Sequence, residues 1–209
     1  MSRIRQALLG ALLLMAGLAF ALLPNHPGAA APGGKLASAV FAGGCFWCTE
    51  SDFDKIPGVV STTSGYAGGK ASSATYEQVS AGGTGHIEVV RVVYDPAKVS
   101  YARLVARFFR TIDPLDGGGQ FCDRGSQYRS AIFVANPAER RIAEATKARA
   151  AALLKRPIAT RILPAAPFYA AEGYHQDYYK KNSTKYKYYR WRCGRESRLA
   201  KVWGNSAAR

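Results

Sequence analysis

The sequence predicts an α+β fold: a two-layer sandwich in which helices pack on a mixed β-sheet, followed by a long C-terminal tail. Three observations support this class. Short apolar or β-branched runs alternate with helical patterns along the chain. Apolar residues make up 48% of the 209 residues, which is enough for a core. Glycine and proline, at 21 and 10 residues, are too few for a low-complexity chain.

Each predicted element is recognised by its apolar spacing and by the residues that end it. Runs bounded by turn residues, mostly glycine or proline, predict strands at residues 38–42, 59–66, 87–94, 130–135 and 159–163. A helix is expected at residues 45–54, and another is expected to run from Asn136 to Leu154. Ser100 is a good N-cap for a helix whose apolar stripe is Leu104, Val105, Phe108, Phe109 and Ile112. The stretch after Ala170 is expected to begin as a helix and then to run over the surface as a tail.

Residues 1–30 have the layout of a secretory signal peptide. Arg3 and Arg5 precede an uncharged run at residues 7–23, and small residues follow at 28–31. We therefore expect an exported protein, periplasmic or secreted, with a single domain at residues 31–209. An uncleaved membrane anchor is the alternative, although the apolar run is slightly short for a span.

The formal net charge of +15 raises the question of an anionic partner. Basic residues are concentrated after Lys180, where they alternate with Tyr186, Tyr188, Tyr189 and Trp191. Such interleaving could bind single-stranded nucleic acid or an anionic surface. An exported chain rarely meets nucleic acid, so we expect no nucleic-acid partner and interpret the segment as a solvated basic surface.

The chemistry is concentrated at Gly43-Gly44-Cys45-Phe46-Trp47-Cys48. A cysteine at the start of a helix lies against unpaired amides and the positive end of the helix dipole, which predicts a lowered thiol pKa. The spacing of Cys45 and Cys48 is that of a redox dithiol and also of half a zinc site. With Cys122 and Cys193, the alternatives are zinc binding or two structural disulfides. The two glycines and two aromatic residues favour a reactive dithiol, with no metal.

A carboxylate also lies on an apolar strand face. Alternation along residues 87–94 places Glu88 with Val90, Val92 and Tyr94. If Glu88 is desolvated, its pKa is raised and it can donate a proton near neutral pH. His86 is interpreted as a turn residue. A cysteine-hydrolase arrangement of Cys45 with His175, Asp177 and Asn182 is the less favoured alternative.

Several ordered motifs resemble one family, the A-type peptide methionine sulfoxide reductases. They are Gly44-Cys45-Phe46-Trp47-Cys48-Thr49-Glu50, residues 65–69, residues 75–79, residues 83–89 and residues 123–130, and the tail contributes residues 173–178 and 193–204. The resemblance covers about residues 40–204. It implies an α+β two-layer sandwich that reduces the S epimer of methionine sulfoxide, protein-bound or free, as protein repair after oxidative damage.

The resemblance also implies roles for individual residues. Cys45 would be the nucleophile, Glu88 would protonate the sulfoxide oxygen, and Tyr76 and Tyr128 would donate hydrogen bonds to it. Asp123 matches a further active-site acid. The substrate methyl group would lie against Phe46 and Trp47. Cys45 would become a sulfenic acid.

A second thiol would then form a disulfide with Cys45, and thioredoxin or a thioredoxin-like donor would reduce it. The candidates for this resolving thiol are Cys48, which is favoured by proximity, and Cys193; Cys122 ranks third. No cofactor and a monomer are expected. The alternative functions are a general thiol–disulfide oxidoreductase, which has no need of Glu88, and a basic binding protein, which has no need of Cys45.

Overall fold

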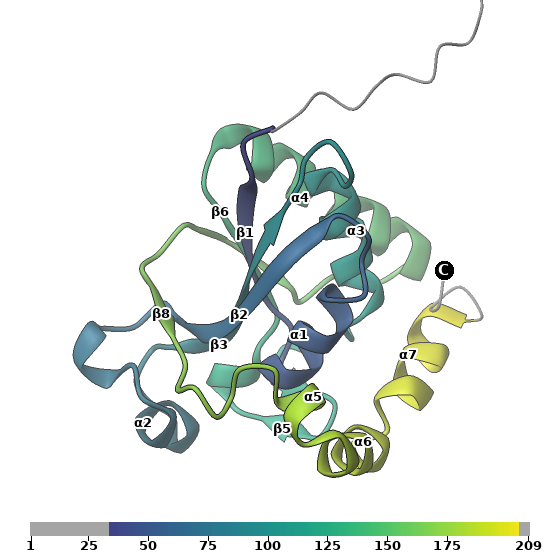
Figure 1. Cartoon of the computed structure of the whole chain (residues 1–209). Helices are drawn as coiled ribbons and strands as arrows, with labels where there is room; N and C mark the ends of the chain where they lie inside the picture. The colour runs from purple at the N-terminus through teal and green to yellow at the C-terminus, as the bar shows by residue number, and fades with distance from the viewer. Residues whose placement is uncertain (1–33, 205–209) are drawn as a thin grey trace, which may run out of the picture. The chain divides into compact units, whose positions relative to one another are not determined.

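A computed structural model describes residues 34–204, in which helices pack on a mixed six-stranded sheet (Figure 1). The expected signal peptide at residues 1–30 lies outside the described residues, so export and cleavage stay predictions. No helix within residues 34–204 is both long and apolar enough to cross a membrane.

The sheet has the strand order β7-β6-β1-β3-β2-β8. Its strands are β1 (Ala37–Ala42), β2 (Val59–Ala67), β3 (Ile87–Tyr94), β6 (Ala131–Val134), β7 (Arg161–Pro164) and β8 (Phe168–Ala170). All neighbours are antiparallel except β6 and β7, which are parallel and are joined through a helix. The strands β4 (Gly119–Gln120) and β5 (Asp123–Arg124) pair with each other in a small hairpin that is separate from the six-stranded sheet. The prediction of a mixed sheet is confirmed.

The longer helices begin where the sequence places their caps. The side chain of Ser100 accepts a hydrogen bond from the Arg103 amide at the start of α3 (Tyr101–Arg110). Asn136 and Glu139 bond reciprocally at the start of α4 (Pro137–Leu154), as in a capping box. The other helices are α1 (Phe46–Phe53), α2 (Tyr76–Ala81), α5 (Tyr178–Lys181), α6 (Ser183–Arg192) and α7 (Arg195–Trp203), with 3-10 turns η1 (Ala71–Ser73) and η2 (Ser126–Tyr128).

The two faces of β3 belong to different apolar clusters. Val90, Val92 and Tyr94 pack in the larger cluster, together with the buried residues of α1 and α3. Ile87 and Val89 pack in a smaller cluster on the opposite face, under Phe168. The alternation read from the sequence is therefore confirmed, and it assigns Glu88 to the helix-covered face.

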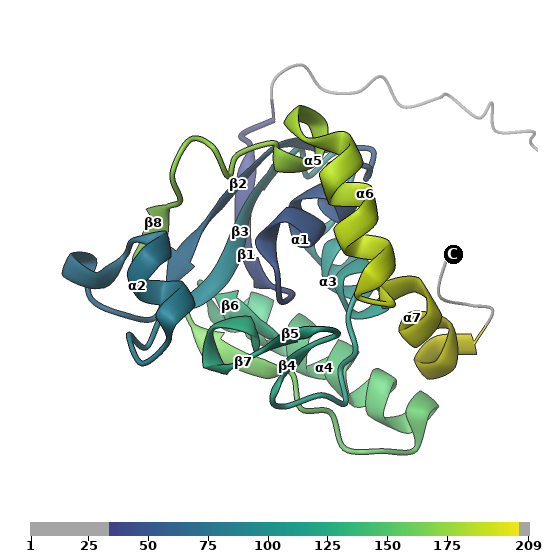
Figure 2. The same cartoon turned by 90° about the horizontal axis from the view of Figure 1, so that it is seen from below.

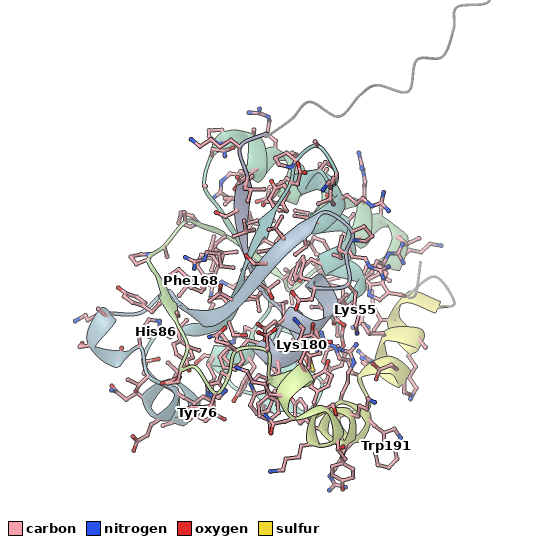
Figure 3. The ribbon with its side chains drawn as sticks, in the orientation of Figure 1. Lys55, Tyr76, His86, Phe168, Lys180 and Trp191 are labelled. Atoms are coloured by element: carbon pink, nitrogen blue, oxygen red, sulfur yellow. A yellow bond between two sulfur atoms is a disulfide. The ribbon has the colours of Figure 1, made fainter. Side chains whose placement is uncertain are left out.

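The C-terminal region differs from the expected surface tail, because it forms the three helices α5, α6 and α7. Figure 2 shows α6 running alongside α1 and continuing into α7. The Trp203 indole donates a 3.1 Å hydrogen bond to the carbonyl of Ile112, which fixes the end of α7. Tyr186 is the buried residue of α6, and most of the helix is open to solvent, including Trp191, which is 73% exposed (Figure 3).

A disulfide joins Cys122, in the β4–β5 hairpin, to Cys193, at the end of α6. Cys193 is therefore not a free thiol, whereas Cys45 and Cys48 are free and buried. Because Cys122 and Cys193 are bonded to each other, the four cysteines do not form a zinc site of four thiolates, and because Cys45 and Cys48 are free, the structure has one disulfide rather than two.

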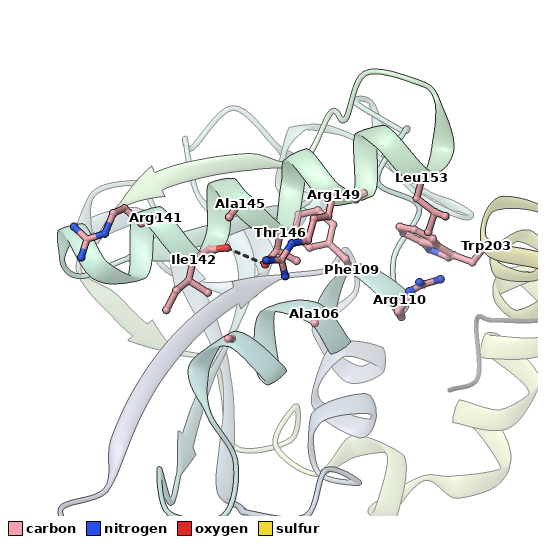
Figure 4. Close-up of a pocket in the computed structure, with 12 residues that line it drawn as sticks. Ala106, Phe109, Arg110, Arg141, Ile142, Ala145, Thr146, Arg149, Leu153 and Trp203 are labelled. Carbon is pink, nitrogen blue, oxygen red and sulfur yellow. Dashed lines mark hydrogen bonds between the residues drawn. The ribbon is translucent and has the colours of Figure 1, made fainter. Parts of the chain in front are cut away.

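A groove of about 410 Å³ lies between α3 and α4. Its floor is formed by small and apolar side chains such as Ala106 and Phe109, and Trp203 lies at one end beside Arg110 (Figure 4). The Arg110 guanidinium lies 4.5 Å from the centre of the Trp203 ring. None of the site residues proposed from the sequence lines this groove.

Removing the disulfide should destabilise the fold without abolishing it. Cys122 and Cys193 are 71 residues apart, so their bond restricts a large loop of the unfolded chain. We expect the double variant Cys122→Ser/Cys193→Ser to lose about 2–4 kcal/mol of unfolding free energy. Guanidinium unfolding without reductant measures the difference, and dithiothreitol should lower the stability of the unmodified protein but not of the variant. Equal stability of the two proteins under oxidising conditions would contradict this account.

Candidate active site

Cys45 lies at the N-cap of α1, directly after two glycines. A Cβ atom at Gly43 would lie 2.6 Å from the Thr49 hydroxyl, and one at Gly44 would lie 2.5 Å from Gln120. Gly44 also has a φ of +82°, which favours glycine. The turn therefore requires both glycines to bring strand β1 directly into the helix, and it leaves Cys45 6% exposed.

The carboxyl group of Glu88 accepts a hydrogen bond from the first turn of the same helix. The Phe46 amide, one of the free donors at the N-terminus of α1, gives a 2.9 Å hydrogen bond to Glu88 Oε2. Glu88 is 2% exposed. Burial raises the pKa of Glu88 to about 8 in spite of this hydrogen bond, which lowers the pKa. At neutral pH the carboxyl group is largely protonated, as a proton donor must be.

The pKa values of the two free thiols are shifted in opposite directions. Burial, followed by the neighbouring Cys48, raises the pKa of Cys45 well above its ordinary value. The hydrogen bond from Cys45 lowers the pKa of Cys48, and Arg195 and Arg190 lower it further. The expected lowering at Cys45 is therefore wrong in the free enzyme, because desolvation outweighs the effect of the helix N-terminus. Within this pair, the charges of Arg195 and Arg190 favour the thiolate form of Cys48.

An aromatic cluster stands beside the dithiol. Trp47 stacks on Tyr178 with 3.8 Å between ring centres, and its indole donates a 3.0 Å hydrogen bond to His175 Nδ1. The ring of Phe46 lies 4.9 Å from that of His175, and Tyr76 lies 4.4 Å from it on another side. Burial lowers the pKa of His175, which suits a neutral ring accepting the indole proton. Figure 3 shows Tyr76 at the end of the molecule that carries α2.

The remaining sequence-proposed residues lie in the same neighbourhood. The hydroxyl of Tyr189, on α6, donates a 2.6 Å hydrogen bond to Asp123 Oδ2. Burial raises the pKa of Asp123. Burial also raises the pKa values of Tyr76 and Tyr128, and the charges of Glu88, Asp123 and Cys45 act on both phenols. The structure therefore brings together all the catalytic residues proposed from the sequence.

Two histidines considered from the sequence have structural contacts. His86 accepts a 3.2 Å hydrogen bond from the Gly69 amide at Nδ1, and its Nε2 bonds the Lys70 carbonyl at 2.9 Å. It holds a turn, as expected. His175 bonds Trp47 rather than Cys45, so the cysteine-hydrolase arrangement finds no support in the contacts of His175.

Sequence reasoning missed four contributors to this site. Tyr189 and His175 support the aromatic cluster, and Glu172 accepts hydrogen bonds from the Tyr76 amide and from the Tyr66 hydroxyl. Arg195 is 2% exposed, and its charge lowers the pKa of Cys48. The density of tyrosine and arginine after residue 174 was a signal, but it was interpreted as a solvated surface.

Comparison with known proteins agrees with this geometry. The sequence profile described as peptide methionine sulfoxide reductase matches residues 37–207. The chain belongs to the peptide methionine sulfoxide reductase family. Within it, the relatives below place the chain with the MsrA type, so the protein is an enzyme that reduces methionine sulfoxide.

The relatives cover most of the chain. It is 56% identical over 169 residues to peptide methionine sulfoxide reductase MsrA 2 of Rhizobium meliloti (strain 1021), spanning 81% of this chain and 84% of that protein. It is 51% identical over 195 residues to MsrA 2 of Caulobacter vibrioides, spanning 92% of this chain and 98% of that one.

Solved structures share the fold. Reduced Mxr1 of Saccharomyces cerevisiae matches with a TM-score of 0.68 at 35% identity, covering 71% of this chain and 87% of that one. Methionine sulfoxide reductase A of Corynebacterium diphtheriae matches with 0.64 at 38% identity, covering 77% and 78%. The α+β class expected from the sequence is confirmed.

The raised pKa of Glu88 has a consequence for stability. Its pKa is about 8 in the folded protein and 4.5 in an ordinary environment, so folding favours the protonated carboxyl. The resulting stability is complete below pH 4.5 and is lost as pH rises towards 8, by about 1.4 kcal/mol per pH unit. We expect Glu88→Gln, whose amide oxygen can still accept the Phe46 hydrogen bond, to be free of this loss.

Urea unfolding of both proteins across this pH range measures the effect. The unmodified protein should lose stability relative to Glu88→Gln with rising pH. A difference that does not change with pH would show that Glu88 titrates normally.

Proposed function

We propose that this enzyme reduces the S epimer of methionine sulfoxide, in proteins or free, with Cys45 as nucleophile and Glu88 as proton donor. The observation that carries the proposal is the buried carboxyl of Glu88 bonded to the Phe46 amide, one residue after Cys45. A sulfoxide bound beside Phe46 and Trp47 would present its sulfur to Cys45 and its oxygen to Glu88.

The first step needs an ionised Cys45 and a protonated Glu88. The Cys45 sulfur attacks the sulfoxide sulfur while Glu88 gives its proton to the oxygen. Tyr76 and Tyr128 keep their protons because their pKa values are raised, so they can donate hydrogen bonds to the same oxygen. The oxygen passes to Cys45, giving a sulfenic acid, and methionine leaves.

The raised pKa of Cys45 fits this order of events. In the free enzyme the buried thiol keeps its proton, which protects it from adventitious oxidation. The thiolate that attacks is formed when substrate occupies the site, and the sulfur of Cys48, which shares a hydrogen bond with Cys45, takes up the proton while Glu88 keeps its own for the sulfoxide oxygen. Asp123, held by Tyr189, completes the polar wall of the site.

Cys48 is proposed to resolve the sulfenic acid. Its amide bonds the Cys45 carbonyl at 3.1 Å, one turn into the helix, so the two sulfurs need no large chain movement. The Cys48 sulfur attacks the sulfur of the Cys45 sulfenic acid, so the S–S bond forms as the S–O bond breaks, and the hydroxide leaves as water with the proton that Cys48 had taken up. Cys193, the other candidate, would first have to leave its bond with Cys122.

A dithiol donor of the thioredoxin type then returns the two electrons. Its thiolate attacks the Cys45–Cys48 disulfide, and both enzyme thiols are released as the donor is oxidised. The pattern of residues 1–30 supports an exported enzyme, so we infer that the donor acts outside the cytoplasm.

Substrate turnover tests the assignment. With racemic methionine sulfoxide and dithiothreitol, the unmodified enzyme should stop near half conversion, because only one epimer fits against the aromatic wall. Cys45→Ser should be inactive, since a hydroxyl cannot replace the thiolate, and chiral chromatography of the remaining sulfoxide identifies the epimer. Consumption of both epimers, or turnover by Cys45→Ser, would refute the proposal. Reduction of insulin disulfides without sulfoxide turnover would favour a general thiol–disulfide oxidoreductase.

Disulfide mapping tests the choice of Cys48. After one equivalent of sulfoxide without reductant, the unmodified enzyme should contain Cys45–Cys48 in addition to Cys122–Cys193. Cys48→Ser should stop at the sulfenic acid, which dimedone traps, and the matched variant Cys122→Ser/Cys193→Ser should still form the Cys45–Cys48 bond. A Cys45–Cys193 bond in the unmodified enzyme would overturn this choice.

A further inference from the structure

Helix α1 carries Cys48 and Asp52 one turn apart; Cys48 is buried, and the Asp52 side chain is 9% exposed where it meets residues of α6 and α7. The Asp52 carboxylate bonds two arginines from these helices: Arg190 Nη1 at 2.9 Å and Arg195 Nη2 at 3.3 Å. A single carboxylate of α1 is thus shared by two guanidinium groups.

Arg195 is held firmly in this place. Its Nη2 donates a 2.6 Å hydrogen bond to the Thr111 carbonyl, and its guanidinium lies 4.3 Å from the centre of the Phe121 ring. Its Nε is buried and has no hydrogen-bond partner within the described part of the chain. A buried guanidinium with a free donor indicates that an acceptor or an anion belongs beside it.

The charges around Asp52 do not balance inside the protein. Arg190 has a second partner, Glu196, but the Glu196 side chain is 61% exposed and lies at the solvent side. Two guanidinium groups, that of Arg190 at 18% side-chain exposure and that of Arg195 at 2%, therefore share the one carboxylate of Asp52. Within the described residues, the only other acid near Arg195 on the inner side is Asp123 of the β4–β5 hairpin. Cys48, one turn before Asp52 on α1, can supply the missing negative charge by ionising.

We propose that Arg195, assisted by Arg190, is a positioning residue that stabilises the thiolate of Cys48. We also propose that the Cys122–Cys193 disulfide keeps Arg195 in its position between Asp52 and Phe121. The inference gains its catalytic meaning from the proposed function, in which Cys48 resolves the Cys45 sulfenic acid. Both arginines act to lower the pKa of Cys48, in agreement with the geometry.

The disulfide connects the two segments that position Arg195: the β4–β5 hairpin and the junction of α6 and α7. Phe121, whose ring lies against the guanidinium, immediately precedes Cys122, and Arg195 follows Cys193 by two residues. The bond therefore joins the hairpin under Arg195 to the junction of α6 and α7 that carries it. Loss of the bond frees both sides and should weaken the hold on Arg195.

Other ionisable groups also act on Cys48 and must be kept constant in a test. They come from α1, β3, α6 and α7 and are Cys45, Asp52, Glu88, Tyr186, Tyr189, Arg190 and Arg195. Substituting only the arginines, in a fixed background, isolates their effect.

The experiment is a titration of Cys48 by NMR of ¹³Cβ-labelled cysteine in the Cys45→Ser background, where Cys48 is the remaining free thiol. Arg195→Gln should raise the midpoint by about one pH unit or more, as expected when a nearby opposite charge is removed. Arg195→Lys should restore part of the shift. Arg198→Gln is the matched control, because Arg198 lies on the same helix but pairs with Asp113, and it should leave the midpoint unchanged.

Arg190→Gln provides a second test if Arg195→Gln does not fold, and it should move the midpoint in the same direction. Unchanged midpoints in folded variants of both arginines would overturn the proposal. Adding Cys122→Ser/Cys193→Ser to the background should also raise the midpoint, and no change there would overturn the role of the disulfide. The titration does not depend on sulfoxide turnover, so disulfide mapping that rejects Cys48 as the resolving thiol would be a separate result.

Discussion

The hydrogen bond from the Phe46 amide to the buried carboxyl of Glu88 is the constraint on which the rest of the site depends. It connects the central strand β3 to the start of α1, and it satisfies a helix-terminal amide that would otherwise be buried without an acceptor. Because Cys45 is the residue before Phe46, the same bond holds Cys45 close to the Glu88 carboxyl. The Gly43-Gly44 turn makes this approach sterically possible.

The two thiols near the start of helix α1 have different surroundings. The start of this helix faces Glu88 and the aromatic cluster, where burial keeps protons on the acid and on Cys45. Its middle faces the guanidinium groups of α6 and α7, which favour ionisation of Cys48. In the proposed reaction the two thiols therefore take different steps: Cys45 attacks the bound sulfoxide, and Cys48 attacks the sulfenic acid that results.

Sequence patterns predicted the features that are set by residues close together in the chain, such as helix caps and strand faces. They missed the features that are set by contacts between residues far apart in the chain. The caps at Ser100 and Asn136 and the strand face of Glu88 follow from spacing alone, and the structure has each of them. The helices α6 and α7 were missed because α6 has no clear apolar stripe, and because Arg190 of α6 and Arg195 of α7 are drawn inward by Asp52, more than 130 residues earlier in the chain. The direction of the Cys45 pKa was wrong for a related reason: the helix terminus is visible in the sequence, whereas the burial that outweighs it is a property of the assembled fold.

The protonation state of Glu88 tests the central claim most directly. NMR of the side-chain carboxyl carbons in ¹³C-labelled glutamate, recorded as a function of pH, reports each carboxyl separately. Glu88→Gln identifies the Glu88 signal by its loss, and Glu50→Gln identifies that of Glu50, whose pKa burial raises to about 7. The account predicts that the Glu88 signal titrates near pH 8 and remains that of a protonated acid at neutral pH. A Glu88 signal that titrates in the range of an ordinary glutamate, and is that of a carboxylate at neutral pH, would contradict it.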